Sequence, residues 1–133
     1  MFSSLAALLS LAAAAALWAQ APPGPARSTI DGVFTAAQAT RGERTFRQTC
    51  TSCHTVGQLT GSQFREKWVG QTVGDIFGFV TNAMPEGNPG SLRPEEYAGV
   101  IAFFLSSSGY PPGEQELPAV QEALSTLRIE APK

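Results

Sequence analysis

The chain has 133 residues, which is enough for one small domain. Its formal net charge of −2 at pH 7 argues against a nucleic-acid-binding protein and gives no general attraction to anionic membranes. Two cysteines and a single histidine are too few for a disulfide framework or for a zinc site with four such ligands.

The N-terminus has the pattern of an export signal. Residues 5–18 are almost all Leu and Ala and carry no charge, whereas a helix that spans a bilayer needs about 20 apolar residues. Small residues follow, so we predict a signal peptide over residues 1–19, cleavage after Ala19 or Ala21, and a periplasmic mature protein without stable membrane insertion. No Lys or Arg precedes the apolar run, and the alternative is a retained membrane anchor or a surface helix.

The residues after the signal divide into three parts. Prolines and a glycine at 22–25 cannot continue a helix, so residues 20–34 are predicted to form a flexible tether. From residue 35 the composition is that of a folded domain. We expect the domain core over residues 35–110 and a C-terminal extension, 111–133, packed on it.

A first helix is expected from Thr35 to about residue 48. Thr35 and Gln38 have the spacing of a capping box, in which the Gln38 side chain reaches back to the backbone of Thr35. Gly42 and Phe46 follow at an interval of four, so they share the helix face that leads to the cysteines.

Two further helices are expected over residues 72–80 and 94–107. The later one begins with a proline and two glutamates, which suit its positive dipole end, and carries apolar residues at intervals of three and four. Arg93 occupies its N-cap, where Ser or Thr is usual, so its start is expected to fray at a cost of about 1 kcal/mol. A last turn or two is expected within residues 118–127. Because no alternating strand pattern is visible, the predicted fold is all-α, with three to five helices.

The chemistry is concentrated at residues 50–54, whose sequence is Cys-Thr-Ser-Cys-His. This is the pattern of c-type haem attachment, in which each thiol adds to one vinyl group of the porphyrin. The spacing lets Cys50 and Cys53 reach the same edge of one haem, and His54 then lies beneath the iron as an axial ligand. We therefore predict one covalent haem c. A redox dithiol of the thioredoxin type is less favoured, because no βαβ pattern surrounds the cysteines.

Met84 is the predicted sixth ligand of the iron. The other methionine, Met1, lies in the predicted signal, and the chain has no second histidine. Met84 opens a Gly- and Pro-rich segment, residues 84–90, that is expected to form a loop over the far face of the haem. The alternative is that Met84 fills a gap in the core. Trp68 is a further candidate, either donating its indole N–H to a haem propionate or packing in the core.

Together these features resemble the class I c-type cytochromes. The resemblance rests on Gly42, Phe46, the motif at 50–54, the Met84-Pro85 pair and Tyr97. It implies a small helical fold wrapped around one covalently bound haem, in which Gly42 lets the first and last long helices approach closely. A narrower likeness, over parts of residues 68–111, is to the small cytochrome domains that accompany, or are fused to, pyrroloquinoline-quinone-dependent alcohol dehydrogenases.

The resulting hypothesis is a periplasmic one-electron carrier, and not an enzyme. Two side-chain ligands would close the iron to substrates, and no acid–base pair is apparent in the sequence. The expected partners are periplasmic redox proteins, namely a quinoprotein dehydrogenase as donor and an oxidase or another cytochrome as acceptor. The alternatives are a peroxidase-like catalytic haem protein, an electron-transfer subunit of a membrane oxidase complex, and a haem module for gas sensing.

Overall fold

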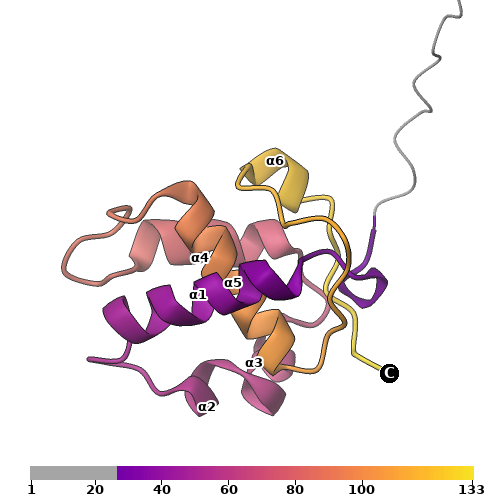
Figure 1. Cartoon of the computed structure of the whole chain (residues 1–133), viewed down its shortest axis with the longest axis horizontal. Helices are drawn as coiled ribbons and strands as arrows, with labels where there is room; N and C mark the ends of the chain where they lie inside the picture. Colours follow the sequence, from indigo (N-terminus) through magenta and orange to yellow (C-terminus); the bar gives the residue numbers. More distant parts are fainter. Residues whose placement is uncertain (1–26) are drawn as a thin grey trace, which may run out of the picture.

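The computed structural model describes residues 27–133. The predicted signal peptide over residues 1–19 and the first part of the predicted tether, 20–26, lie outside these residues. The described chain forms one 3₁₀ turn and six α-helices (Figure 1): η1 (Thr29–Asp31), α1 (Ala36–Thr49), α2 (Val56–Leu59), α3 (Gly61–Trp68), α4 (Val73–Ala83), α5 (Pro94–Ser107) and α6 (Gln121–Leu124).

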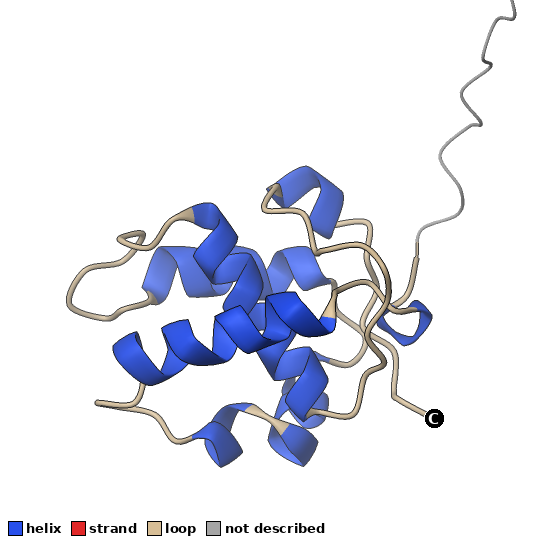
Figure 2. Ribbon diagram, viewed as in Figure 1, coloured by secondary structure: helices blue, strands red, loops and turns tan. Residues whose placement is uncertain are grey.

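The all-α prediction is confirmed over the described part of the chain. No strand occurs there (Figure 2), and the only extended pairing consists of two isolated bridges that Arg128 forms with Ser28 and Thr72. Six helices exceed the predicted three to five, because α2 and α6 are single turns of four residues. None of the helices in residues 27–133 is long and apolar enough to cross a membrane.

Helices α1 and α5 cross at a pair of glycines and form the centre of the fold (Figure 1). A Cβ atom built on Gly42 would lie 1.8 Å from the carbonyl oxygen of Gly99, so the two backbones are in direct contact. One turn further along α1, the ring of Phe46 packs on Phe103 and Phe104 at centroid distances of 5.5 and 5.7 Å. The close crossing thus brings the aromatic residues of both helices into one cluster.

The ends of α4 and α5 follow local signals in the sequence. Thr72 and Asp75 form a reciprocal capping box at the start of α4: the Asp75 N–H donates to the Thr72 hydroxyl at 3.1 Å, and the Thr72 N–H donates to the Asp75 carboxylate at 2.8 Å. At the start of α5, the Arg93 N–H donates to the carboxylate of Glu96 at 2.9 Å. The first turn of α5 is therefore closed by Glu96, three residues into the helix, instead of by the N-cap side chain.

Two helices between residues 56 and 68 were not predicted. The first, α2, is one turn long, and α3 buries a single side chain, that of Phe64. An amphipathic stripe is recognised by several buried positions at helical spacing, and one buried residue cannot produce it. These helices carry the chain from residue 55 to Trp68, and Phe64 of α3 belongs to the hydrophobic core.

The predicted flexible tether over residues 20–34 is wrong for its C-terminal part. Thr29 and Phe34 are fully buried. The Thr29 N–H donates to the carbonyl of Arg128 at 2.9 Å, and the Gly113 N–H donates to the carbonyl of Phe34 at 2.6 Å. A segment with buried side chains and paired backbone groups cannot act as a tether.

The C-terminal extension lies beside this N-terminal segment, at the right of Figure 1. Its side chains Leu117, Leu124 and Ile129 are at most 3% exposed. We refer to residues 27–34 and 111–130 together as the terminal layer. Residues of this layer cover the N-terminal end of α1, at the right of Figure 1.

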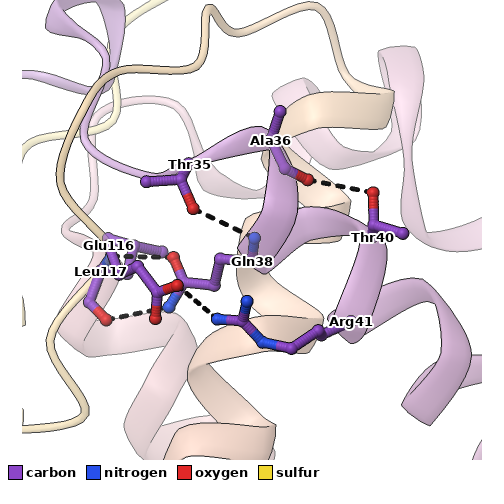
Figure 3. A network of polar contacts seen from close by, with 7 residues as sticks. All are labelled: Thr35, Ala36, Gln38, Thr40, Arg41, Glu116 and Leu117. Carbon is purple, nitrogen blue, oxygen red and sulfur yellow. Dashed lines mark hydrogen bonds and ion pairs between the residues drawn. The ribbon is translucent and has the colours of Figure 1, made fainter.

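Gln38 joins α1 to the terminal layer (Figure 3). The predicted capping box is half formed: the Thr35 hydroxyl accepts from the Gln38 N–H at 3.0 Å, but the Gln38 side chain does not return to Thr35. Instead its amide donates to the Leu117 carbonyl at 3.0 Å and accepts from the Leu117 N–H at 2.8 Å. Nearby, Arg41 forms an ion pair with Glu116. The Gln38 amide thus provides the hydrogen-bond partners of the buried N–H and carbonyl of Leu117, which lies 79 residues further along the chain.

Candidate cofactor site

A cavity of about 820 Å³ lies between α1, α3, α4 and α5, within the roughly 300–1,000 Å³ range of cofactor and ligand pockets. Most of its walls are apolar. The apolar lining residues are Phe46, Leu59, Phe64, Trp68, Ile76, Phe79, Val80, Leu92, Val100 and Phe104. A site of this kind favours a large, mainly hydrophobic occupant.

The two cysteines and the histidine lie on the wall that follows α1. Cys50 is the C-cap of α1, and its N–H donates a hydrogen bond to the carbonyl of Phe46 at 2.8 Å. The N–H groups of Cys53 and His54 then both donate to the carbonyl of Cys50, at 3.2 and 2.9 Å. This tight turn brings both thiols and the imidazole to one side of the cavity.

Both thiols are free, and their surroundings differ. Cys50 is partly buried and Cys53 is exposed. Burial raises the pKa of the Cys50 thiol, because desolvation disfavours the thiolate.

Met84 reaches the same cavity from α4. It is the C-cap of that helix, with an extended backbone, and its bond to Pro85 is cis. The loop that it opens and the turn that follows α1 both lie at the left of Figure 1, on either side of the end of α1. All four predicted attachment and ligand residues thus line one cavity, although they come from segments thirty residues apart.

Trp68, the fifth predicted site residue, lies at the C-terminal end of α3 and also lines the cavity. Its ring packs on Phe79 at a centroid distance of 5.9 Å. The ammonium of Lys67 lies 4.8 Å from the centroid of Trp68 and 4.4 Å from that of Phe79. The structure therefore adds Lys67 and Phe79 to the cavity wall. The sequence analysis did not single out Phe79, and the available signal was that it is an aromatic residue outside the buried side of α4.

The chemistry of these donors fits a covalently bound haem. Two thiols, one imidazole and one thioether face an apolar cavity, and these are the groups by which c-type haems are attached and their iron is ligated. Within residues 27–133, no three His, Cys, Asp or Glu side chains form a cluster that could hold a metal ion directly. The two thiols at this spacing, with the imidazole and the thioether, suit an iron held in a porphyrin.

Comparison with protein families gives a match over the centre of the chain. A family model described as cytochrome C oxidase, cbb3-type, subunit III matches residues 37–104, about half of the chain. The matched region runs from the first turn of α1 almost to the end of α5, and it contains all five predicted cofactor-binding residues. No curated protein and no solved structure matches significantly.

Proposed function

Because the chain belongs to the cytochrome c domain family named after subunit III of cbb3-type cytochrome c oxidases, we propose that it is a monohaem cytochrome that carries one electron at a time in the periplasm. The observation that carries this proposal is the shared cavity. Cys50, Cys53 and His54 line one of its walls and Met84 lines another.

Each of these side chains has a distinct role in the proposal. Cys50 and Cys53 each add S–H across a vinyl group, so that sulfur bonds one carbon, hydrogen goes to the other, and no oxidant or reductant is consumed. His54 and Met84 would hold the haem iron through the imidazole and the thioether. When bound, haem supplies an iron that changes its oxidation state by one electron. A thioether ligand favours the ferrous state relative to a second imidazole and therefore raises the potential.

The walls of the cavity serve the same function. The apolar side chains of Ile76, Val80 and Val100 exclude water from the cofactor. At the wall formed by α3 and α4, Lys67 offers an ammonium and Trp68 an indole N–H, either of which suits a propionate.

Expression in the periplasm with the cytochrome c maturation factors tests the attachment. The wild type is expected to be red, and its haem is expected to resist acid–acetone extraction after denaturation. The double variant Cys50→Ser with Cys53→Ser removes both attachment points and is expected to yield no covalent haem. Extractable haem in the wild type would overturn the proposal.

A second experiment tests the sixth ligand. Met84→Ala is expected to lose the weak far-red band of thioether-ligated ferric haem, to bind carbon monoxide readily, and to have a lower midpoint potential. An unchanged spectrum would assign the sixth position to another group. Rapid turnover of peroxide by the wild type would instead favour the catalytic alternative.

We further propose a quinoprotein dehydrogenase as the electron donor, on the basis of the sequence likeness over parts of residues 68–111. Phe79 and Val69 are 46% and 39% exposed and provide apolar contact area at or beside the cavity wall. Since the net charge is only −2, encounter should depend weakly on ionic strength. Stopped-flow mixing with substrate-reduced quinoprotein measures this directly. Reduction no faster than with an unrelated dehydrogenase would remove this donor.

A subunit of a membrane oxidase complex is the second candidate, and the description of the matching family favours it. The two candidates differ in what becomes of the N-terminal apolar segment. A carrier released into the periplasm is expected to begin at Gln20 or Pro22 and to carry one haem, as measured by intact mass. Recovery of a chain that begins at Met1, together with an oxidase in detergent extracts, would favour the subunit.

A further inference from the structure

The loop that begins at Met84 is tied to α5 by one side chain. Tyr97 is 1% exposed, and its hydroxyl donates to the Met84 carbonyl at 2.7 Å. The same hydroxyl oxygen lies 3.5 Å from the Leu92 N–H, which donates to it. One phenol thus connects both ends of the loop to the central helix pair.

The loop has few other supports. The Met84 N–H is bonded to the carbonyl of Val80 at 2.9 Å, as the last bond of α4. Beyond it, the Asn88 N–H donates to Pro85 at 2.8 Å and the Gly90 N–H donates to Met84 at 3.4 Å, both within the loop. Among the described residues, the bond from the Leu92 N–H to the Tyr97 hydroxyl is therefore the only hydrogen bond that joins residues 85–92 to a part of the fold outside this loop.

From this geometry we propose that Tyr97 is a positioning residue that holds Met84 in place as the sixth ligand. The inference rests on the proposed function, in which the Met84 thioether binds iron. Tyr97 lines the cavity but acts through the Met84 backbone. The hydrogen bond from the Tyr97 hydroxyl to the Met84 carbonyl is partly buried, and at 2.7 Å it is much shorter than the 3.4 Å contact from the Gly90 N–H to the same carbonyl. The hydroxyl is therefore the stronger restraint on the residue whose side chain is proposed to bind the iron.

Tyr97→Phe tests this role, because it removes the hydroxyl and retains the packed ring. Titration of the oxidised protein with imidazole, followed by loss of the far-red thioether band, measures how easily an external ligand displaces Met84. We expect Tyr97→Phe to require a roughly tenfold lower imidazole concentration than the wild type. An unchanged titration would overturn the inference.

Tyr110→Phe is the matched control. Tyr110 is 3% exposed and is the only other tyrosine, and its hydroxyl makes no hydrogen bond to the loop at residues 84–92. The control also removes a buried phenolic hydroxyl, and it is expected to titrate like the wild type. An equal shift in both variants would point to a general loosening of the fold and would also overturn the inference.

Two further measurements separate the possible failures. Met84→Ala establishes whether the far-red band belongs to Met84 at all: if the band persists there, the proposed ligation fails before Tyr97 is considered. Thermal unfolding at saturating imidazole, where Met84 is already displaced, detects a purely structural role. Positioning predicts that most of the difference between Tyr97→Phe and the wild type disappears under that condition, whereas a purely structural role predicts that it remains.

Discussion

The terminal layer lies at the right of Figure 1, and the loop and turn that border the cavity lie at its left; these two ends of the molecule are closed by different means. The terminal layer is tied together by hydrogen bonds between distant peptide groups, such as those from Thr29 to Arg128 and from Gly113 to Phe34. The cavity instead has mainly apolar walls, and one phenol, that of Tyr97, links its loop to the helices.

This difference indicates what each end requires. The terminal layer needs no cofactor for its packing, because backbone groups of its two segments are hydrogen-bonded to each other and to Gln38 of α1. The apolar walls of the cavity would instead pack against the haem that we propose to occupy it. Burying this surface contributes about 25 cal/mol of stabilising free energy per Å² of apolar surface removed from water. Variants that affect one end and spare the other therefore test the comparison.

Gly42→Ala is expected to have the largest effect, because both ends depend on the α1–α5 crossing. The added methyl group would lie 1.8 Å from the Gly99 carbonyl oxygen, which is backbone and cannot move aside. We expect a loss of about 3 kcal/mol or more in the free energy of unfolding, together with a poor yield of haem-containing protein. Denaturant titration of the purified protein measures the loss.

Gly57→Ala is the matched control for this substitution. Gly57 is also helical, and a Cβ built on it meets nothing within 4 Å. Its stability is expected to stay within about 0.5 kcal/mol of the wild type or to rise slightly. Similar losses in the two variants would mean that the close crossing is not what makes Gly42 necessary.

Gln38→Ala is expected to have an intermediate effect that is confined to the terminal layer. It leaves the buried N–H and carbonyl of Leu117 without partners, at a cost of about 1–3 kcal/mol. Because Gln38 does not line the haem cavity, the visible spectrum of the variant should match that of the wild type. Thermal unfolding and absorbance of the same sample test both expectations, and a changed spectrum would show that the two ends are coupled.

Gln71→Ala provides the control for Gln38. The Gln71 amide also donates to a backbone carbonyl, that of Lys67, at 2.6 Å, but the residue is exposed. Water replaces the lost bond, so the expected change is within about 0.5 kcal/mol.

Asp75→Asn is expected to have the smallest effect, and one that depends on pH. Hydrogen bonds from the Thr72 N–H and hydroxyl lower the pKa of the Asp75 carboxyl. The folded state therefore binds this proton less tightly than the unfolded state, and the stabilisation present at neutral pH is lost as the pH falls through the lowered pKa. Because the group is exposed, we expect only a few tenths of a kcal/mol at pH 7.

Thermal midpoints at pH 7 and near pH 2 measure this dependence. Asp75→Asn should lie below the wild type at the higher pH and approach it at the lower one. A difference of the same size at both values would mean that the carboxylate charge has no part in capping α4.

The sequence by itself determined the elements whose signals are local. Pro94 and the glutamates after it marked the start of α5, and the Thr72 and Asp75 pair marked the start of α4, because a helix end depends on residues within one turn. The motif at 50–54 likewise predicted a haem, since two thiols and an imidazole at that spacing form one short turn.

The tertiary structure alone decided which distant groups meet. Gln38 had the spacing of a capping box, yet its side chain pairs with Leu117, and no local pattern contains a partner 79 residues away. The buried position of Phe34 depends on the C-terminal extension for the same reason. The hydrogen bond from the Tyr97 hydroxyl to the Met84 carbonyl likewise depends on the packing of α5 against the loop that follows α4. Local signals place the helices, but the partner of a buried polar group is set by packing between segments far apart in the chain.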